Sequence, residues 1–228
     1  MKSPIPQQKA LQIWYFAFAK QHITYIMIID FNVNYNNYEE KILNFYGFWE
    51  YKCPCCGARH SLTRHASYTR NICFLIAIGI EEHKIKILRL VCSSCNTTHA
   101  ILPADTIPYC IYSFSCILQI LTKLFVDEQS VIQISNKNHV SFQLIYLFIK
   151  RLIKHYNPCI NFLRMFLTVQ LDFTSSFKDV ISIITKNFSC IDFQREYINY
   201  TKLVFLMIRN QNILSRKVHI GAYFKAPT

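Results

Sequence analysis

The chain has 228 residues, of which 52% are hydrophobic, 10 are cysteine and only 4 are glycine. This is enough apolar sequence to bury a core, so the composition excludes a disordered tail and a disulfide-stapled miniprotein. The glycine-based phosphate loops of nucleotide enzymes are also missing, because no G-x-G-x-x-G or G-x-x-x-x-G-K-[ST] string occurs. We therefore expect a folded protein without a nucleotide cofactor.

The net charge is +12, and it is unevenly distributed along the chain. Residues 1–50 are neutral overall, whereas residues 51–100 and 156–228 each carry +5. Such an excess favours a polyanionic partner, because Lys and Arg contacts to phosphates release condensed counterions. The alternative is a solvated basic surface that serves only solubility.

No run of about 20 consecutive apolar residues, the length that crosses a bilayer core, is present. The apolar stretch 10–29 is interrupted by Lys20, Gln21 and His22. The first residues also lack the apolar centre and cleavage site of a secretory signal. We therefore expect a cytoplasmic protein without a membrane-spanning segment.

The first predicted unit, residues 1–50, is rich in aromatic residues and asparagine. Its pattern predicts a strand over 23–33, a loop over 34–37 and a short helix from Tyr38. We expect this α/β unit to pack on the one that follows.

The second predicted unit, residues 51–106, contains two cysteine clusters. Each includes a C-x2-C pair, and 35 residues separate the pairs. This spacing is typical of a structural zinc site with four thiolate ligands. The predicted ligands of one Zn²⁺ ion are Cys53, Cys56, Cys92 and Cys95.

Three further features of this unit leave alternatives open. Cys55 adjoins the first pair and could replace Cys56 as a ligand. His99 follows Cys95 by four residues, but two C-x2-C pairs already complete a tetrahedral site, so we expect it to pack or to form a hydrogen bond beside the site. The remaining cysteines are expected to be reduced and buried; they are Cys73, Cys110, Cys116, Cys159 and Cys190.

The segment between the cysteine pairs predicts the strands of a zinc ribbon. An apolar run at 72–80 precedes a polar stretch at 81–83, which we interpret as the turn, and an alternating strand at 84–90. The candidate phosphate contacts of this ribbon are Arg64, Arg70, Lys86 and Arg89, with His60 and His65 nearby. A solvated basic surface is again the alternative.

The third predicted unit, residues 107–209, is helical, and a basic tail follows at 210–228. Within it, residues 130–154 predict a short helix, a turn at Asn138 and His139, and a second helix capped by Ser141. This stretch resembles the helix-turn-helix of bacterial repressors and transposases. The matching positions are Ser130, Ile134, Ser135, Val140, Ser141, Ile145, Tyr146, Ile149, Lys150 and Arg151. His139 replaces the usual turn glycine, and histidine tolerates the positive φ of that position.

The helix-turn-helix docking mode places the start of the second helix in the major groove of double-stranded DNA. It nominates Phe142, Gln143, Tyr146 and Leu147 for base edges, and Ser141, Lys150 and Lys154 for phosphates. The alternative is an ordinary amphipathic helical hairpin within an α-helical core.

Several strings together resemble a family of bacterial zinc-ribbon proteins of unassigned activity with a CPxCG and a THAxLP motif. They lie at residues 53–57, 64–70, 89–103 and 107–113, and the resemblance covers about residues 45–155. That family is similar to the zinc-ribbon and helix-turn-helix front end of insertion-sequence transposases. The resemblance implies DNA binding linked to mobile elements, and it brings no catalytic residues.

The resulting expectation is an α+β protein in which a zinc ribbon precedes a mainly helical part. It would bind DNA as a transposition accessory factor or transcriptional regulator, because the 74 residues after Lys154 are too few for a three-carboxylate catalytic domain. One alternative is a protein-interaction module with a partner such as a transposase subunit. Another is a compact metal-dependent nuclease that uses Asp172 or Asp192.

Overall fold

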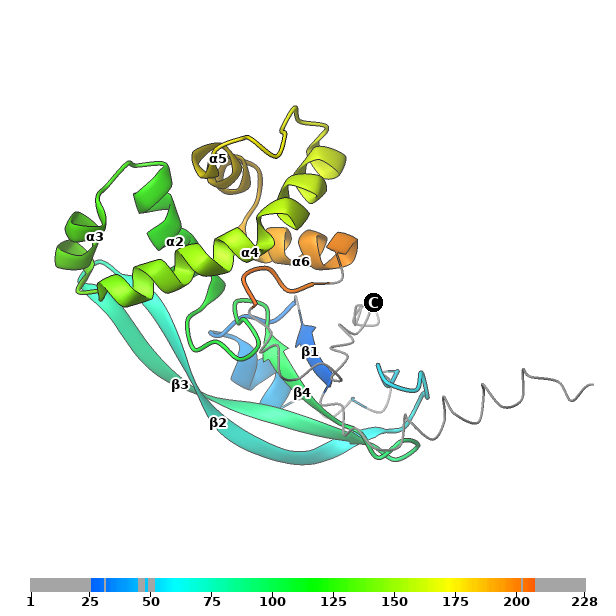
Figure 1. Ribbon diagram of the computed structural model, residues 1–228. Helices are drawn as coiled ribbons and strands as arrows, with labels where there is room; N and C mark the ends of the chain where they lie inside the picture. Colours follow the sequence, from blue (N-terminus) through cyan, green and yellow to red (C-terminus); the bar gives the residue numbers. More distant parts are fainter. Residues whose placement is uncertain (1–25, 31, 45–47, 49–51, 202, 208–228) are drawn as a thin grey trace, which may run out of the picture.

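A computed structural model of the chain describes residues 26–30, 32–44, 48, 52–201 and 203–207 (Figure 1). Within these ranges the protein contains one four-stranded sheet followed by helices, so the expected α+β class is confirmed at this level. The expected strand residues 23–25 and the tail 210–228 lie outside the described residues. None of the described helices is long and apolar enough to cross a membrane.

The sheet has the strand order β1-β4-β3-β2. Its strands are β1 (Ile26–Asp30), β2 (Leu62–Ile76), β3 (Gly79–Cys92) and β4 (Thr98–Pro103). β1 runs parallel to β4, and the other two pairs are antiparallel. β2 and β3 form a long curved hairpin that extends well beyond the rest of the sheet and passes beneath the helices (Figure 1).

The turn of this hairpin differs from the sequence prediction. It lies at residues 77–78, where Ile76 pairs with Gly79, and not at 81–83. Glu81, Glu82 and His83 lie within β3 and pair with residues 72–74 of β2. The prediction was wrong because two apolar residues form the turn, so no polar stretch marks it, and Gly79 adopts a φ of 139° beside it.

The N-terminal segment packs on the sheet around Tyr38. This side chain is 1% exposed; its hydroxyl donates to the carbonyl of Ile101 at 2.8 Å and accepts from the N–H of Leu88 at 3.0 Å. It therefore bridges β3 and β4 through hydrogen bonds. The short π-helix η1 (Glu39–Leu43) follows and buries Ile42 in the same small core.

Five α-helices lie in the described part after the sheet. They are α2 (Phe114–Phe125), α3 (Val131–Asn138), α4 (Phe142–Leu167), α5 (Phe177–Asn187) and α6 (Cys190–Thr201). Serine caps the first four, since a Ser oxygen at each N-cap accepts a backbone N–H of the first turn. The capping serines are Ser113, Ser130, Ser141 and Ser176.

Helix α4 is longer than the sequence predicts. The stretch predicted to hold its second helix ends at residue 154, but that helix continues to Leu167 and has 26 residues. Pro158 lies inside it, and the helix bends along its length (Figure 1). Burial of Cys159, Ile160 and Leu163 holds the second half against the core, which explains why proline does not end the helix.

The helices enclose a core dominated by aromatic rings. Its fully buried rings include Phe114, Phe148, Phe162, Phe193, Tyr197 and Phe205. The segment 203–207 enters this core after α6, although the sequence predicted helix to residue 209. Arg151 of α4 donates to the carbonyl of Leu206 at 2.8 Å, and His155 donates to that of Met207 at 2.8 Å. Helix α4 therefore holds the end of the described chain.

Candidate metal centre and nucleic-acid interface

Two tight turns carry the clustered cysteines. In the first, the N–H of Cys53 donates to the carbonyl of Ala58, and the N–H of Gly57 donates to the carbonyl of Cys53, both at 2.8 Å. The second turn repeats this pattern 39 positions later. There the N–H of Cys92 donates to the carbonyl of Thr97 at 3.0 Å, and the N–H of Asn96 donates to the carbonyl of Cys92 at 2.8 Å. Each turn thus forms the same knuckle.

Each knuckle closes on a residue with positive φ, 73° at Gly57 and 54° at Asn96. Glycine and asparagine are residues that adopt this conformation at low cost. The local sequence therefore explains both turns without reference to the rest of the fold.

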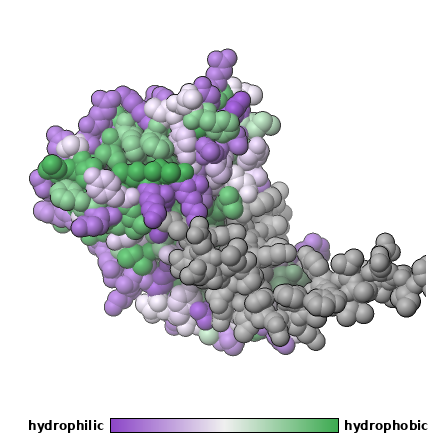
Figure 2. All heavy atoms as spheres, in the orientation of Figure 1, coloured by the Kyte–Doolittle hydropathy of each residue, from purple (hydrophilic) through white to green (hydrophobic). Residues whose placement is uncertain are grey.

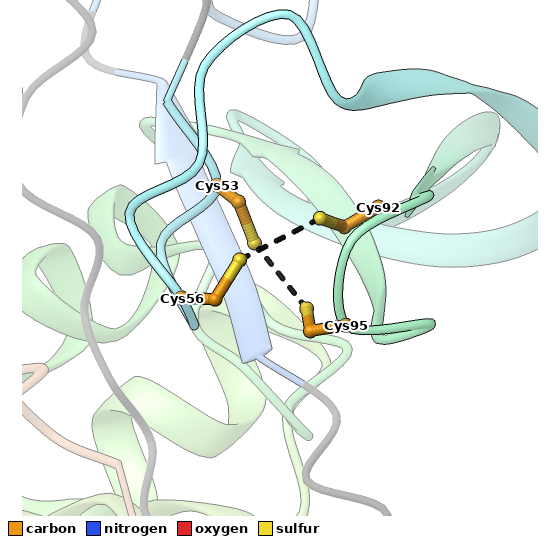
Figure 3. Close-up of side chains that lie close together, drawn as sticks. All are labelled: Cys53, Cys56, Cys92 and Cys95. Atoms are coloured by element: carbon orange, nitrogen blue, oxygen red, sulfur yellow. Dashed lines mark hydrogen bonds between the residues drawn. The ribbon is translucent and has the colours of Figure 1, made fainter.

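The four knuckle sulfurs lie within 4.8 Å of one another (Figure 3). The Sγ atoms of Cys53 and Cys95 are 3.7 Å apart, as are those of Cys56 and Cys92. A tetrahedral ion with metal–sulfur bonds of about 2.3 Å requires sulfur separations of about 3.8 Å. The predicted cysteines are thus brought together at a spacing that can hold a metal ion.

Cys55 lies outside this cluster. Its side chain is exposed, and the hydroxyl of Thr97 lies 3.7 Å from its sulfur. Its backbone N–H donates to the sulfur of Cys53 at 3.4 Å. The structure therefore brings Cys56 and not Cys55 into the group of four sulfurs.

The cluster places its thiols in different electrostatic surroundings. Burial raises the pKa of Cys53 and of Cys56. Burial also acts to raise the pKa of Cys92, but hydrogen bonding with Ser61 and with backbone N–H groups lowers it to about 6. Ser61 Oγ lies 3.2 Å from this sulfur, a contact that the sequence does not predict because no spacing rule connects residue 61 to the knuckles.

His99 lies beside the sulfur cluster, as expected, and is fully buried. Its Nε2 atom is 3.4 Å from the sulfur of Cys53. A ring N–H in this position can donate to a metal-bound thiolate and orient it.

Arg64 and Arg70 hold neighbouring segments of the protein. Arg64 donates to the carbonyls of Ile42 and Leu43 in the N-terminal segment. Arg70 donates to the carbonyl of Ile107 at 2.7 Å and to that of Cys110, and burial lowers its pKa. The guanidinium group of Arg64 therefore connects β2 to η1, and that of Arg70 connects β2 to the segment between β4 and α2.

The basic residues of the hairpin do not share a face. Side chains alternate along a strand, so Lys86 and Arg89 of β3 point to opposite faces. The strand pairing places Arg70 on the face of Arg89, and Arg64 on the face of Lys86. Arg89 also lies over the ring of Tyr68, 4.6 Å from its centroid. The four nominated residues are thus distributed over two faces.

Helices α3 and α4 meet at a short turn. A capping box between Ser130 and Gln133 begins α3, and His139 ends it with a φ of 51°. The hydroxyl oxygen of Ser141 then accepts the N–H of Leu144 at 3.3 Å and caps α4. The residues that join the two helices are buried; they are Ile134, Val140, Ile145 and Phe148.

The nominated residues of α4 all lie on its exposed side. Those that are exposed are Phe142, Gln143, Tyr146, Leu147, Lys150 and Lys154. At 100° per residue they cover about 140° of the helix circumference, opposite the buried side. Figure 2 shows hydrophobic and hydrophilic residues side by side over α3 and the first half of α4.

This region also lacks acidic residues. The sequence from 129 to 171, which includes both helices, contains no Asp or Glu. Lys137 of α3 is exposed like Lys150 and Lys154 of α4, whereas Arg151 is buried and holds residue 206. Near the start of α4 the exposed positive charge is carried by lysines, and Arg164 is exposed towards the C-terminal end of the helix.

The carboxylates nominated for a nuclease are engaged locally. Asp172 accepts from the hydroxyl of Thr174 at 2.7 Å and from its backbone N–H at 2.8 Å, and Asp192 accepts from the hydroxyl of Ser189 at 2.6 Å. These contacts lower the pKa of both carboxyl groups. Among the described residues, the one group of three or more candidate metal ligands is the cysteine cluster.

Comparison with known proteins gives one finding. Residues 53–137 match the family described as "Domain of unknown function (DUF6431)". The match includes both knuckles, the hairpin and α2, and it ends within α3, before α4 begins. No curated protein and no solved structure matches the chain.

Proposed function

We propose that this chain is a zinc-stabilised protein that binds double-stranded DNA through the exposed side of α4. The observation that carries the proposal is the position of the nominated residues. Gln143, Tyr146, Lys150 and Lys154 share one exposed helix side next to a short turn, in a region without acidic residues. In this proposal α3, its turn and α4 act as a helix-turn-helix unit in the cytoplasm.

The proposed metal is Zn²⁺, in a structural role. Four thiolates are a ligand set that zinc occupies tetrahedrally, and they leave no open position for water or substrate. Cys53, Cys56, Cys92 and Cys95 have the sulfur spacing that this geometry requires. The ion would hold the two knuckles together and so close the base of the hairpin.

The proposed DNA footprint is narrower than the sequence suggests. Arg64 and Arg70 already bind carbonyls of the chain, and Lys86 and Arg89 point to opposite faces of the hairpin. We therefore assign the main phosphate contacts to Lys150 and Lys154. The resemblance to transposase front ends supports a role as accessory factor or regulator of a mobile element.

A protein-interaction surface is the second candidate for the same helix side. It is favoured by the exposure of large apolar side chains, 44% at Phe142 and 59% at Tyr146. Solvated positions with this much aromatic surface often contact another protein. A transposase subunit is the partner that the resemblance implies.

The salt dependence of duplex binding tests the first proposal. Each phosphate contact contributes about one unit to the slope of log affinity against log salt, so Lys150→Ala with Lys154→Ala is expected to reduce that slope by about 2. The matched control is Lys84→Ala with Lys186→Ala, which removes the same charge from exposed positions on β3 and α5. Fluorescence anisotropy with a labelled duplex measures both.

The outcomes separate the candidates. An unchanged slope in the α4 variant, or no duplex binding by the zinc-loaded protein at low salt, contradicts DNA binding through α4. If the α4 variant loses affinity for duplex DNA while the control variant retains it, α4 contacts DNA. Retention of a protein partner by the lysine variant, together with loss in Tyr146→Ala, supports the second candidate.

A further inference from the structure

The first two turns of α4 present four exposed side chains, Phe142, Gln143, Tyr146 and Leu147. Their positions are rigidly supported. Ser141 caps the helix immediately before them; Val140, which precedes the cap, is 2% exposed, and Ile145, which lies between Gln143 and Tyr146 in the sequence, is fully buried. A rigid helix start is what precise contacts to base edges require.

These four side chains are apolar or neutral polar. None of the four is charged, and the first exposed cation on this side is Lys150, three residues beyond Leu147. Guanine is read by Arg or Lys through its O6 and N7 acceptors, and cytosine by an acidic side chain through its amino group. Neither kind of residue is present at the start of α4.

Adenine and thymine match what is present. The amide of Gln143 can donate to N7 and accept from the N6 amino group of adenine in the major groove. The apolar atoms of Phe142 and Leu147 suit the thymine methyl group.

The amide of Gln143 is also available for such contacts. Within the described part of the chain it forms no hydrogen bond, whereas the amide of Gln133 accepts the N–H of Ser130 at 2.7 Å. Gln133 is therefore committed to a helix cap, and Gln143 is not.

We infer that the start of α4 selects A·T base pairs in the major groove. Gln143 contacts adenine, and Phe142 and Leu147 contact thymine methyl groups on the same side of the helix. Lys150 and Lys154, further along, hold the phosphate backbone. This inference rests on the proposed DNA-binding function and adds the base preference of the site.

Selection from a random duplex pool with the full-length zinc-loaded protein tests the preference, and it is expected to enrich a core of A·T pairs. Gln143→Ala is then expected to weaken binding to the selected duplex about 5- to 100-fold, the value of one bidentate base contact. Binding to a shuffled duplex should change less than twofold, because the phosphate contacts remain. The exposed position of Gln143 makes it a safe site for substitution.

Base analogues identify the atoms involved. Replacement of adenine by 7-deazaadenine removes the N7 acceptor and should weaken binding by the wild-type protein but not by Gln143→Ala. Uracil in place of thymine removes the methyl group and should weaken binding by the wild type more than by a Phe142→Ala, Leu147→Ala double variant. Gln143→Arg is expected to move the selected core towards guanine.

Three results overturn the inference while DNA binding itself stands: a G·C core from the selection, equal losses of Gln143→Ala on selected and shuffled duplexes, or no effect of 7-deazaadenine on the wild type. Absence of any duplex binding at low salt overturns the proposed function and the inference together. These outcomes distinguish the failure of the base preference from the failure of DNA binding.

Discussion

The two ends of the β2–β3 hairpin are stabilised in different ways. At one end, the knuckle cysteines converge at the strand termini, with Ser61 and His99 as polar neighbours. At the other end, Leu75 and Ile80 join the aromatic core of the helices. A single strand pair therefore connects a region that carries a candidate metal site to one that depends on apolar burial.

The two ends of the hairpin are therefore expected to differ in what stabilises them. Burial raises the pKa of Cys53 and of Cys56, so the charged thiolate forms are costly to hold close together without an ion, whereas the helical core is complete in itself. We therefore expect a perturbation at one end of the hairpin to leave the other end largely unchanged.

Metal removal is expected to have the largest effect. Binding of zinc to four thiolates is worth about 10–16 kcal/mol at neutral pH in small zinc domains, so its loss should unfold the knuckles and the base of the hairpin. The helices should remain, because their core contains no metal ligand. Zinc analysis, far-UV circular dichroism and amide hydrogen exchange, before and after chelation, measure the two regions separately.

Two neighbouring cysteines give the matched test. Cys56→Ser is expected to reduce the zinc content from about one ion per chain to near zero. Cys55→Ser should leave it unchanged, because the sulfur of Cys55 lies outside the group of four. The reverse result would mean that Cys55 is the ligand, and loss of all helical signal on chelation would show that the two regions are not separable.

A substitution in the helical core should destabilise the helices and leave zinc binding unchanged. Phe193 is fully buried and stacks between Phe114 and Tyr197, with ring centroids 5.8 and 5.7 Å away. Phe193→Ala is expected to lower the free energy of unfolding of the helices by about 3–5 kcal/mol, with zinc content unchanged. Phe173→Ala, at a position 54% exposed, is the control and should cost less than about 0.5 kcal/mol.

The cysteine cluster was the part of the structure most accessible from sequence. Both knuckles are local, since each C-x2-C pair and its positive-φ residue lie within five positions. Only the approach of the two knuckles to each other is a long-range contact. It could be predicted because a structural zinc site takes four thiolate ligands, which two C-x2-C pairs supply. The caps at Ser130 and Ser141 were equally local, and a capping box or an N-cap serine is visible in the sequence.

The turn at 77–78 and the length of α4 depended on distant contacts. Ala77 and Ile78 carry no turn signal, and Gly79 beside them packs closely against the end of α3. Pro158 disfavours a continuous helix, but the buried residues beyond it keep α4 intact. In both places tertiary packing overrode the local preference.

The net charge could be read from the sequence, but the hydrogen-bond partners and the exposure of each basic side chain could not. Arg64 and Arg70 bind carbonyls that are more than 20 and more than 35 positions away, respectively. Lys150 and Lys154 remain at the surface. A count of basic residues treats these side chains alike, although only the lysines are exposed on a helix side that can meet a phosphate backbone.

The two positive-φ glycines allow an intermediate test at both ends of the hairpin. A Cβ at Gly79 would lie 3.0 Å from the carbonyl oxygen of Asn138, with a φ of 139°, whereas one at Gly57 would meet nothing within 4 Å. We expect Gly79→Ala to cost about 1–3 kcal/mol and to loosen α3 from the hairpin turn. Gly57→Ala should instead strain the backbone of the first knuckle by about 1 kcal/mol, and zinc affinity should fall by a similar free energy.

Thermal unfolding with parallel zinc titration measures this pair of variants. Each glycine should affect mainly its own end of the hairpin. If Gly79→Ala weakened zinc binding as much as Gly57→Ala, the hairpin would transmit strain over its full length, and the two ends would form one cooperative unit.

The smallest expected effect concerns the start of α4, where one side chain is assigned two roles. The oxygen of Ser141 caps the helix by accepting the N–H of Leu144, and the same residue is nominated to lie near a DNA phosphate. Ser141→Ala removes the cap and should lower the free energy of unfolding by about 1 kcal/mol.

Ser141→Asp keeps a capping oxygen and adds a negative charge that the helix N-terminus favours, so it should retain stability. That charge would repel phosphate, and DNA affinity should therefore fall in Ser141→Asp although the fold is intact. Equal DNA affinity of the Asp variant and the wild type would remove Ser141 from the DNA interface and leave it only a capping role.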